Sequence, residues 1–295
     1  MIPHLHLHLE PEERKRRAVG LPSRRPRSSA AFFDAHRVDT PDRVRVSGHD
    51  LGRFLRDVHA EHEAQGVDYV EVRVSPRRFL TDGLSLDDVL GITHRVLDGL
   101  RGPYVRVVLL LNRDCPDETL EECAAALTRL PSTFVGVDIA GDERRHPDVD
   151  RFQAFCSAAR SAGRGVTVHA GEFGSDRHIW SALDRLGAQR IGHGIAAASS
   201  KTLMDRLARD HVHVEVSLTS NAALGAVRDI EAHPVRTLIE HGVSVSFNAD
   251  VPLHTGRSFR AEISTAAEVL HCTTSEVLAL QKRALPYCFT EFPLD

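Results

Sequence analysis

The segments FVGVDIAG (134–141), GVTVHAGE (165–172) and RIGHG (190–194) follow one another along the chain and decide the fold. They are short, largely apolar and rich in β-branched residues, which is typical of strands buried on both faces of a parallel sheet. Pro147 is placed to begin a helix between the first two segments, and Gly163 is placed to end it. Strand, helix and strand in this order predict parallel neighbours joined by an outer helix.

The same alternation extends in both directions from this stretch. Further strand candidates are 4–9, 67–75, 105–112, 212–220 and 243–250. Helical patterns are predicted at 86–99, 117–130, 148–162, 177–186, 201–210, 234–240, 260–270 and 275–285. Eight strands, each followed by a helix or by room for one, favour a (β/α)₈ TIM barrel over a doubly wound sheet. No linker rich in proline, glycine or serine divides the chain, so residues 1–295 are expected to form a single domain.

The segment 11–41, directly after the first strand, differs from the rest of the chain. Its stretch 14–27 carries six arginines and one lysine with little apolar periodicity. We predict an irregular basic excursion there. Two interpretations stay open: the arginines only solvate a loop, or they lie over the pocket and bind an anionic group of the substrate.

Composition limits the classes of partner and compartment. The 295-residue chain has 42% hydrophobic residues and a formal net charge of −4, which argues against binding a nucleic acid polymer. No apolar run is long enough to span a membrane, and no secretory signal pattern begins the sequence. Five scattered cysteines without a CxxC pair suggest reduced thiols and a cytoplasmic protein. The oligomeric state cannot be predicted from these features.

Polar side chains gather where four of the predicted strands end. In a parallel barrel these ends form one rim, on which the active site lies. The first strand brings two imidazoles to the same side, because residues two apart in a strand share a face. The rim residues are His6, His8, His169, Glu172, His193 and Asp250. Burying this many ionisable groups together is costly unless a cation or a substrate compensates.

Imidazoles combined with a carboxylate suit Zn²⁺, and Fe²⁺ or Co²⁺ fit the same ligand types. A bound metal ion lowers the pKa of water toward neutrality and so supplies a nucleophile. With three imidazoles and one carboxylate binding one ion per chain, Glu172 and His193 remain as an acid–base pair.

The motifs resemble those of the adenosine deaminase family, within the amidohydrolase superfamily, in their order along the chain. The matching segments are HLHLE (6–10 with its preceding residues), VEVRVSP (70–76), GVDIAGDE (136–143), HAGE (169–172), IGHG (191–194), TSN (219–221), HP (233–234) and NAD (248–250). The resemblance runs from Leu5 to about Pro252 and implies a metal-dependent barrel that hydrolytically deaminates an amino-substituted purine, nucleoside or related heterocycle.

The resemblance also implies roles for individual residues. The metal ligands it implies are His6, His8, His169 and Asp250. Glu172 would protonate the ring nitrogen beside the amino-bearing carbon, and His193 would orient and deprotonate the attacking water with help from Asp250. Gly141 would contact the heterocycle, and Glu10 would reach a sugar hydroxyl.

Three departures from the family pattern concern substrate recognition. Val251 stands where a second aspartate usually bonds to the five-membered ring of the purine. Pro11 replaces the glycine after the first acidic residue, and Leu218 replaces the proline before the TSN segment. Because a lost hydrogen bond changes specificity strongly, we expect intact chemistry with an altered substrate-recognition shell.

Two other functions are compatible with a metal-binding barrel. One is a different mononuclear hydrolase that cleaves a cyclic amide or an ester. Two-metal hydrolases of that kind usually need a bridging lysine, and Lys15, Lys201 and Lys282 lie away from the strand ends. The other is a non-catalytic binding protein, which would have no need of both Glu172 and His193.

Overall fold

Eight parallel strands form a barrel in their sequence order, as predicted. The computed structural model describes residues 1–37, 40 and 43–290. The strands are β1 Pro3–His8, β2 Tyr69–Val74, β3 Tyr104–Asn112, β4 Phe134–Ala140, β5 Gly165–Ala170, β6 Arg190–His193, β7 His213–Val216 and β8 Val245–Phe247. The ring closes between β8 and β1, where His8 N–H donates to the Asp250 carbonyl at 2.8 Å and Asp250 N–H donates to the His6 carbonyl at 3.1 Å.

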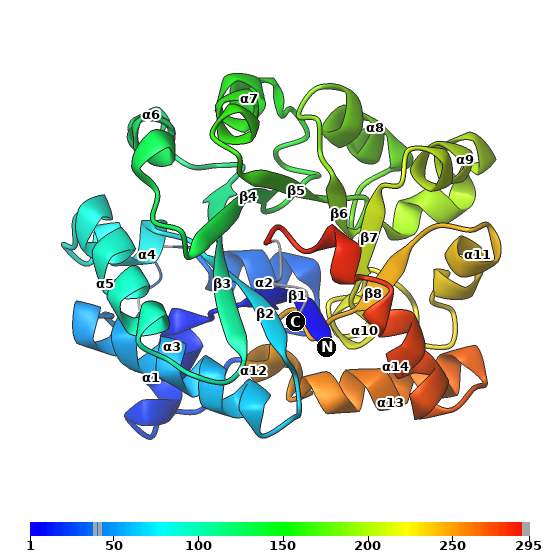
Figure 1. Cartoon of the computed structure of the whole chain (residues 1–295), viewed down its shortest axis with the longest axis horizontal. Coiled ribbons are helices and arrows are strands. Elements are labelled where there is room, and N and C mark those ends of the chain that lie inside the picture. The colour runs from blue at the N-terminus through cyan, green and yellow to red at the C-terminus, as the bar shows by residue number, and fades with distance from the viewer. Residues whose placement is uncertain (38–39, 41–42, 291–295) are drawn as a thin grey trace.

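The helices surround the strands (Figure 1). They are α1 Pro11–Ala18, α2 Ser29–Ala35, α3 Gly48–Glu63, α4 Arg77–Thr81, α5 Leu86–Asp98, α6 Asp117–Ala126, α7 Gln153–Ser161, α8 Asp176–Asp184, α9 Lys201–Arg209, α10 Leu218–Ala223, α11 Val235–Glu240, α12 Pro252–Thr255, α13 Phe259–Leu270 and α14 Thr274–Lys282. Within the described residues, no helix combines the length and the apolar character needed to cross a membrane.

Two strand predictions extended too far. The predicted strand 212–220 ends at Val216, and the TSN segment lies in the first turns of α10. The predicted strand 243–250 is regular only over Val245–Phe247. In both cases the polar residues beyond the strand lie on irregular or helical backbone, which turns them toward the rim.

The prediction of an irregular segment at 11–41 was wrong for α1 and α2. Pro11 occupies the first turn of α1, acidic residues follow it, and basic residues fill the last turn, an arrangement that matches the helix dipole. Ser28 caps α2 by accepting a hydrogen bond from Ala31 N–H. The helical signal lies in the order of the charges, acidic residues first and basic residues after them, which the prediction of a basic run did not use. Residues 38, 39 and 41 lie outside the described residues.

An irregularity in β1 directs its histidines. The pairing of β1 with β2 shifts register between His4 and Leu7. The Asn248 side chain stabilises this bulge, since its Oδ1 accepts hydrogen bonds from Leu5 N–H and His6 N–H, both at 3.0 Å. His6 therefore faces the barrel interior, whereas His4 lies against α3, with its Nδ1 2.8 Å from His62 Nε2.

At the N-terminal end of the barrel, Phe289 covers the beginnings of β4, β5 and β6. The ring of Phe289 lies 3.6 Å from the guanidinium carbon of Arg190. A Cβ added at Gly165 would come within 2.1 Å of this ring, and one at Gly136 within 2.5 Å. These two glycines therefore leave room for the Phe289 ring.

Candidate active site

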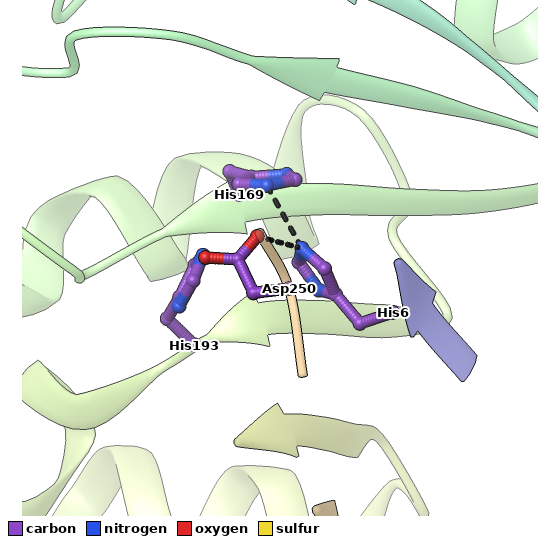
Figure 2. A group of neighbouring side chains, drawn as sticks. All are labelled: His6, His169, His193 and Asp250. Carbon is purple, nitrogen blue, oxygen red and sulfur yellow. Dashed lines mark hydrogen bonds and ion pairs between the residues drawn. The ribbon is translucent and has the colours of Figure 1, made fainter. Parts of the chain in front are cut away.

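The predicted rim residues converge at the C-terminal ends of the strands. The Nε2 atom of His169 lies 3.0 Å from His6 Nε2 and 3.2 Å from His8 Nε2. Asp250 Oδ1 is 3.4 Å from His6 Nε2 and 3.3 Å from His8 Nε2. Figure 2 shows three of these side chains together with His193, which comes from the end of β6. The structure thus brings together the four predicted metal ligands.

Two buried carboxylates fix the tautomers of two of the three ligand histidines. His6 Nδ1 lies 2.8 Å from Glu215 Oε2, and His169 Nδ1 lies 3.0 Å from Asp138 Oδ2. Because a carboxylate accepts, each Nδ1 carries the proton and each Nε2 presents a lone pair. Burial and Arg73 oppose a positive charge on His6, yet the neighbouring Asp250 and Glu215 carboxylates raise its pKa. Converging lone pairs in surroundings that favour positive charge are what a divalent cation requires, so the residues present fit a metal ion.

Arg73 holds both supporting carboxylates in place. Its Nε donates to Asp138 Oδ2 at 3.0 Å, and its Nη2 forms a short ion pair with Glu215. All three side chains are fully buried. Arg73, Asp138 and Glu215 were not predicted as site residues, although the first two lie within the motifs VEVRVSP and GVDIAGDE. Sequence alone gave no sign that they share one network.

His193 belongs to a different hydrogen-bonded chain. Val235 N–H donates to His233 Nδ1 at 3.1 Å, so His233 carries its proton on Nε2 and donates it to Asn221 Oδ1 at 3.2 Å. The Asn221 amide nitrogen then faces Glu172 Oε1 at 2.9 Å and His193 Nδ1 at 3.0 Å. His193 Nδ1 therefore accepts, and the neutral ring has its proton on Nε2.

This tautomer gives His193 a different role from that of the metal ligands. Burial lowers the pKa of His193 to about 3, so the ring is neutral. Neither of its nitrogens has a free lone pair, whereas His6 and His169 each present one on Nε2. His193 lies within reach of the cluster but is equipped to donate a hydrogen bond rather than to bind a cation.

Glu172 is positioned by the loop after β5. The carboxylate of Glu143 accepts backbone N–H groups of Gly171, Phe173 and Gly174 at 2.6–2.9 Å and so holds the backbone on both sides of Glu172. Burial, with the nearby carboxylates of Asp250 and Glu143, raises the pKa of Glu172 well above its usual range. Glu172 is thus a carboxylic acid that can donate a proton. Glu143 is a further positioning residue that sequence reasoning missed.

A cavity of about 160 Å³ opens onto these groups. Gly141 and Val251, two of the residues expected to surround the substrate, line it. Gly141 has a φ of 119°, which a residue with a side chain rarely adopts, and a Cβ at this position would lie 3.4 Å from the backbone nitrogen of Arg113. Phe32, Phe33 and His36 cover the cavity from α2 and its C-terminal end, and none of them was predicted.

Glu10 lines the cavity, but its carboxylate oxygens already have partners. They accept hydrogen bonds from Leu253 N–H at 3.0 Å and His254 N–H at 3.2 Å, at the start of α12. Burial raises the pKa of Glu10 to about 8. Its expected contact with a sugar hydroxyl remains a prediction that competes with this role.

The basic run 14–27 does not line the cavity. Arg14 pairs with Glu61 at 2.8 Å, and Arg24 pairs with Glu12 at 2.8 Å. Arg17 and Arg25 border a separate groove between α1, α3 and α12. Of the two interpretations left open, the one in which this run lies over the pocket is therefore not supported, since none of its six arginines lines the cavity.

Comparison with known proteins settles the family. The sequence model of the family described as adenosine deaminase matches residues 22–294. The chain belongs to the adenosine deaminase family. An adenosine deaminase from Edwardsiella ictaluri is 33% identical over 231 residues, which cover 76% of this chain and 68% of that protein. Membership makes the chain a metal-dependent aminohydrolase that acts on amino-purines.

Solved structures of the same fold include an adenine deaminase from Arthrobacter aurescens, with a TM-score of 0.86, 22% identity and coverage of 98% of this chain and 94% of that one. An amidohydrolase from Burkholderia ambifaria with bound Zn has a TM-score of 0.80 and 20% identity, with coverage of 98% and 86%. At these identities the likeness shows the shared barrel.

Proposed function

We propose that this member of the family is a zinc-dependent deaminase that replaces the amino group of an amino-purine, or of its nucleoside, with oxygen and releases ammonia. The observation that carries the proposal is the meeting of three imidazole Nε2 atoms and one carboxylate beside the raised-pKa acid Glu172. An acid near a metal site, facing a cavity, matches what this reaction needs at its reacting carbon.

His6, His8, His169 and Asp250 would hold one divalent ion per chain. Their nitrogen and oxygen donors suit Zn²⁺, and Fe²⁺ or Co²⁺ could replace it. When bound, such an ion acts as a Lewis acid and lowers the pKa of water, which provides a nucleophile at neutral pH. Glu215 and Asp138 keep His6 and His169 in the ligand tautomer.

Glu172 supplies the proton that makes the heterocycle electrophilic. Asn221 donates a hydrogen bond to Glu172 Oε1, which leaves Oε2 to carry the acidic proton. Transfer of that proton to the ring nitrogen beside the amino-bearing carbon makes the carbon open to attack by water. The backbone hydrogen bonds to Glu143 keep this acid in position.

His193 and Asp250 act on the attacking water. His193 donates from Nε2 and so orients the water oxygen, since its Nδ1 is held by Asn221. Asp250, whose Oδ2 accepts the Ser220 hydroxyl at 2.5 Å, is the base that takes up the proton. The tautomer of His193 supports this scheme, in which Asp250 alone carries out the deprotonation that the family resemblance gave to both residues.

Ammonia release from metal-loaded protein on a panel of amino-purines and aminopteridines tests this function. We expect turnover of at least one aminopurine, and Glu172→Gln should abolish most of it while the protein keeps its metal. Hydrolysis of cyclic amides or esters without ammonia release would favour the alternative hydrolase. Binding of these compounds without turnover would favour the non-catalytic protein, and either result would contradict the proposal.

A further inference from the structure

The cationic side chains on the cavity wall are already neutralised. Arg73 is engaged by the two carboxylates that support the ligand histidines. Arg77 Nη1 pairs with Asp114 Oδ1 at 2.9 Å. Arg78 Nη1 lies 3.3 Å from Glu12 Oε2, and the Arg78 guanidinium also donates to backbone carbonyls. Each arginine among the described lining residues therefore already has an acidic partner.

Glu13, on the first turn of α1, has a carboxylate oxygen without a partner. It lines the same cavity and is only 2% exposed. Its Oε2 accepts a hydrogen bond from Arg24 N–H at 3.0 Å. Its Oε1 is buried and, among the described residues, receives no hydrogen bond. A buried carboxylate oxygen without a donor is costly, so a ligand that supplies an N–H or O–H group is stabilised here.

The other acidic side chains of the lining are compensated by nearby groups. Glu10 is occupied by two backbone N–H groups of α12. Glu12 Oε1 accepts from Arg24 Nη2 at 2.8 Å. Its Oε2 also receives no hydrogen bond among the described residues, but the positively charged Arg78 guanidinium lies 3.3 Å away and compensates its charge. Glu172 and Asp250 are committed to the reaction. Glu13 is therefore the lining carboxylate best able to read a substrate group that does not take part in the chemistry.

We propose that Glu13 is a specificity-determining residue that accepts a hydrogen bond from an uncharged N–H or O–H group of the substrate. The pocket consequently selects free amino-purines or their nucleosides over 5′-phosphates. This inference rests on the proposed function and adds the substrate class to it. A phosphate would meet the Glu13 carboxylate in a cavity whose arginines are paired, and it would find none of the basic run there. The donor is either the ring N–H of a free base or a sugar hydroxyl of a nucleoside.

The test compares adenine, 9-methyladenine, adenosine and AMP as substrates of the wild type and of Glu13→Gln. We expect the wild type to prefer an uncharged substrate over AMP by roughly a hundred-fold or more in kcat/KM. Glu13→Gln should raise KM for the donor-bearing substrate by about ten-fold or more, with a smaller change in kcat. The control Glu63→Gln, an exposed glutamate on α3, should leave all four values unchanged.

The two sources of the donor give different patterns. A ring N–H predicts that adenine is preferred over 9-methyladenine and that Glu13→Gln removes this preference. A sugar hydroxyl predicts the same loss for adenosine relative to 9-methyladenine. A wild type that prefers AMP, or a Glu13→Gln variant that loses equal activity on all substrates, would overturn the inference.

Binding measurements separate this inference from the proposed function. Calorimetric titration of the folded protein with hypoxanthine, inosine and IMP requires no turnover. We expect IMP to bind more weakly than the better of the other two and Glu13→Gln to weaken only that ligand. If no substrate is deaminated, the proposed function fails, while IMP binding as tightly as the uncharged products would overturn the role of Glu13.

Discussion

At the N-terminal end of the barrel, the buried charges of Arg190 and Glu71 are paired, whereas at the C-terminal end several buried polar atoms of the described residues lack a partner. Arg190 pairs with Glu215 at 2.7 Å and forms a short ion pair with Glu71, which also accepts hydrogen bonds from the Tyr69 hydroxyl and Phe289 N–H. At the other end, imidazole lone pairs face one another, and Glu13 Oε1 lacks a donor. The first arrangement stabilises the fold, and the second needs ligands to complete it.

The largest effect on activity is expected from removing a metal ligand at the C-terminal end of the barrel. Asp250→Ala should lose bound metal and activity together, with turnover falling below detection, because it removes a ligand and the base at once. Elemental analysis and ammonia release on the same sample measure both. Asp98→Ala, at the exposed end of α5, is the matched control and should change neither. An Asp250→Ala protein that binds no metal but keeps the turnover of the wild type would contradict the role of the metal ligands.

The second-largest effect on activity is expected from Glu172, whose substitution should leave the bound metal in place. Glu172→Gln should lower kcat by roughly 10²–10⁴-fold, as expected when an acid–base group is lost. Its thermal stability should stay equal or rise, because the amide avoids the cost of keeping a buried carboxyl protonated at neutral pH beside Asp250 and Glu143. Thermal unfolding alongside kinetics tests this; a variant with near-normal kcat would remove Glu172 from the mechanism.

A substitution at the N-terminal end of the barrel should lower stability and leave kcat unchanged. Phe289→Ala removes the ring that covers Arg190 and fills the space beside Gly165. Because this ring is partly buried, we expect a loss of about 2 kcal/mol in the free energy of unfolding. At a temperature where the variant remains folded, its kcat should match the wild type. A large drop in kcat without a change in stability would mean that the two ends are not separable.

The smallest expected effect concerns substrate choice. Val251 lines the cavity with an apolar side chain that is 3% exposed. Val251→Asp adds an acceptor where family members usually have one, and adenosine turnover should rise by about ten-fold, the value of one good hydrogen bond. Val251→Asn, which is similar in size but uncharged, is the control for shape. Adenosine turnover unchanged or reduced in the aspartate variant would show that this position does not limit recognition of the purine.

The barrel and its rim were predictable because each depends on local sequence. Eight apolar runs identified the strands, and their ends identified the six rim residues, since parallel strands place their ends together. The strand 243–250 was overextended because the backbone at Asp250 turns into a left-handed conformation with a φ of 55°. Periodicity cannot reveal such a turn.

Contacts between distant segments were not predictable. The pairing of Arg73 with Glu215 joins residues 142 positions apart, and the tautomer of His193 depends on His233 and Val235. The role of Glu13 depends on where α1 lies relative to the cavity and on a backbone N–H eleven residues away. A single sequence shows which residues have suitable chemistry, but only the fold shows which of them already have partners.

Titration of metal into metal-free protein, with ammonia release followed at each step, tests the central claim most directly. The account predicts that activity toward the best aminopurine rises in proportion to added Zn²⁺ and reaches its plateau at one ion per chain. The Asp250→Ala protein should show neither tight binding nor activity in the same titration. Full deaminase activity in the metal-free protein, or activity that does not follow the occupancy of one site, would contradict the account.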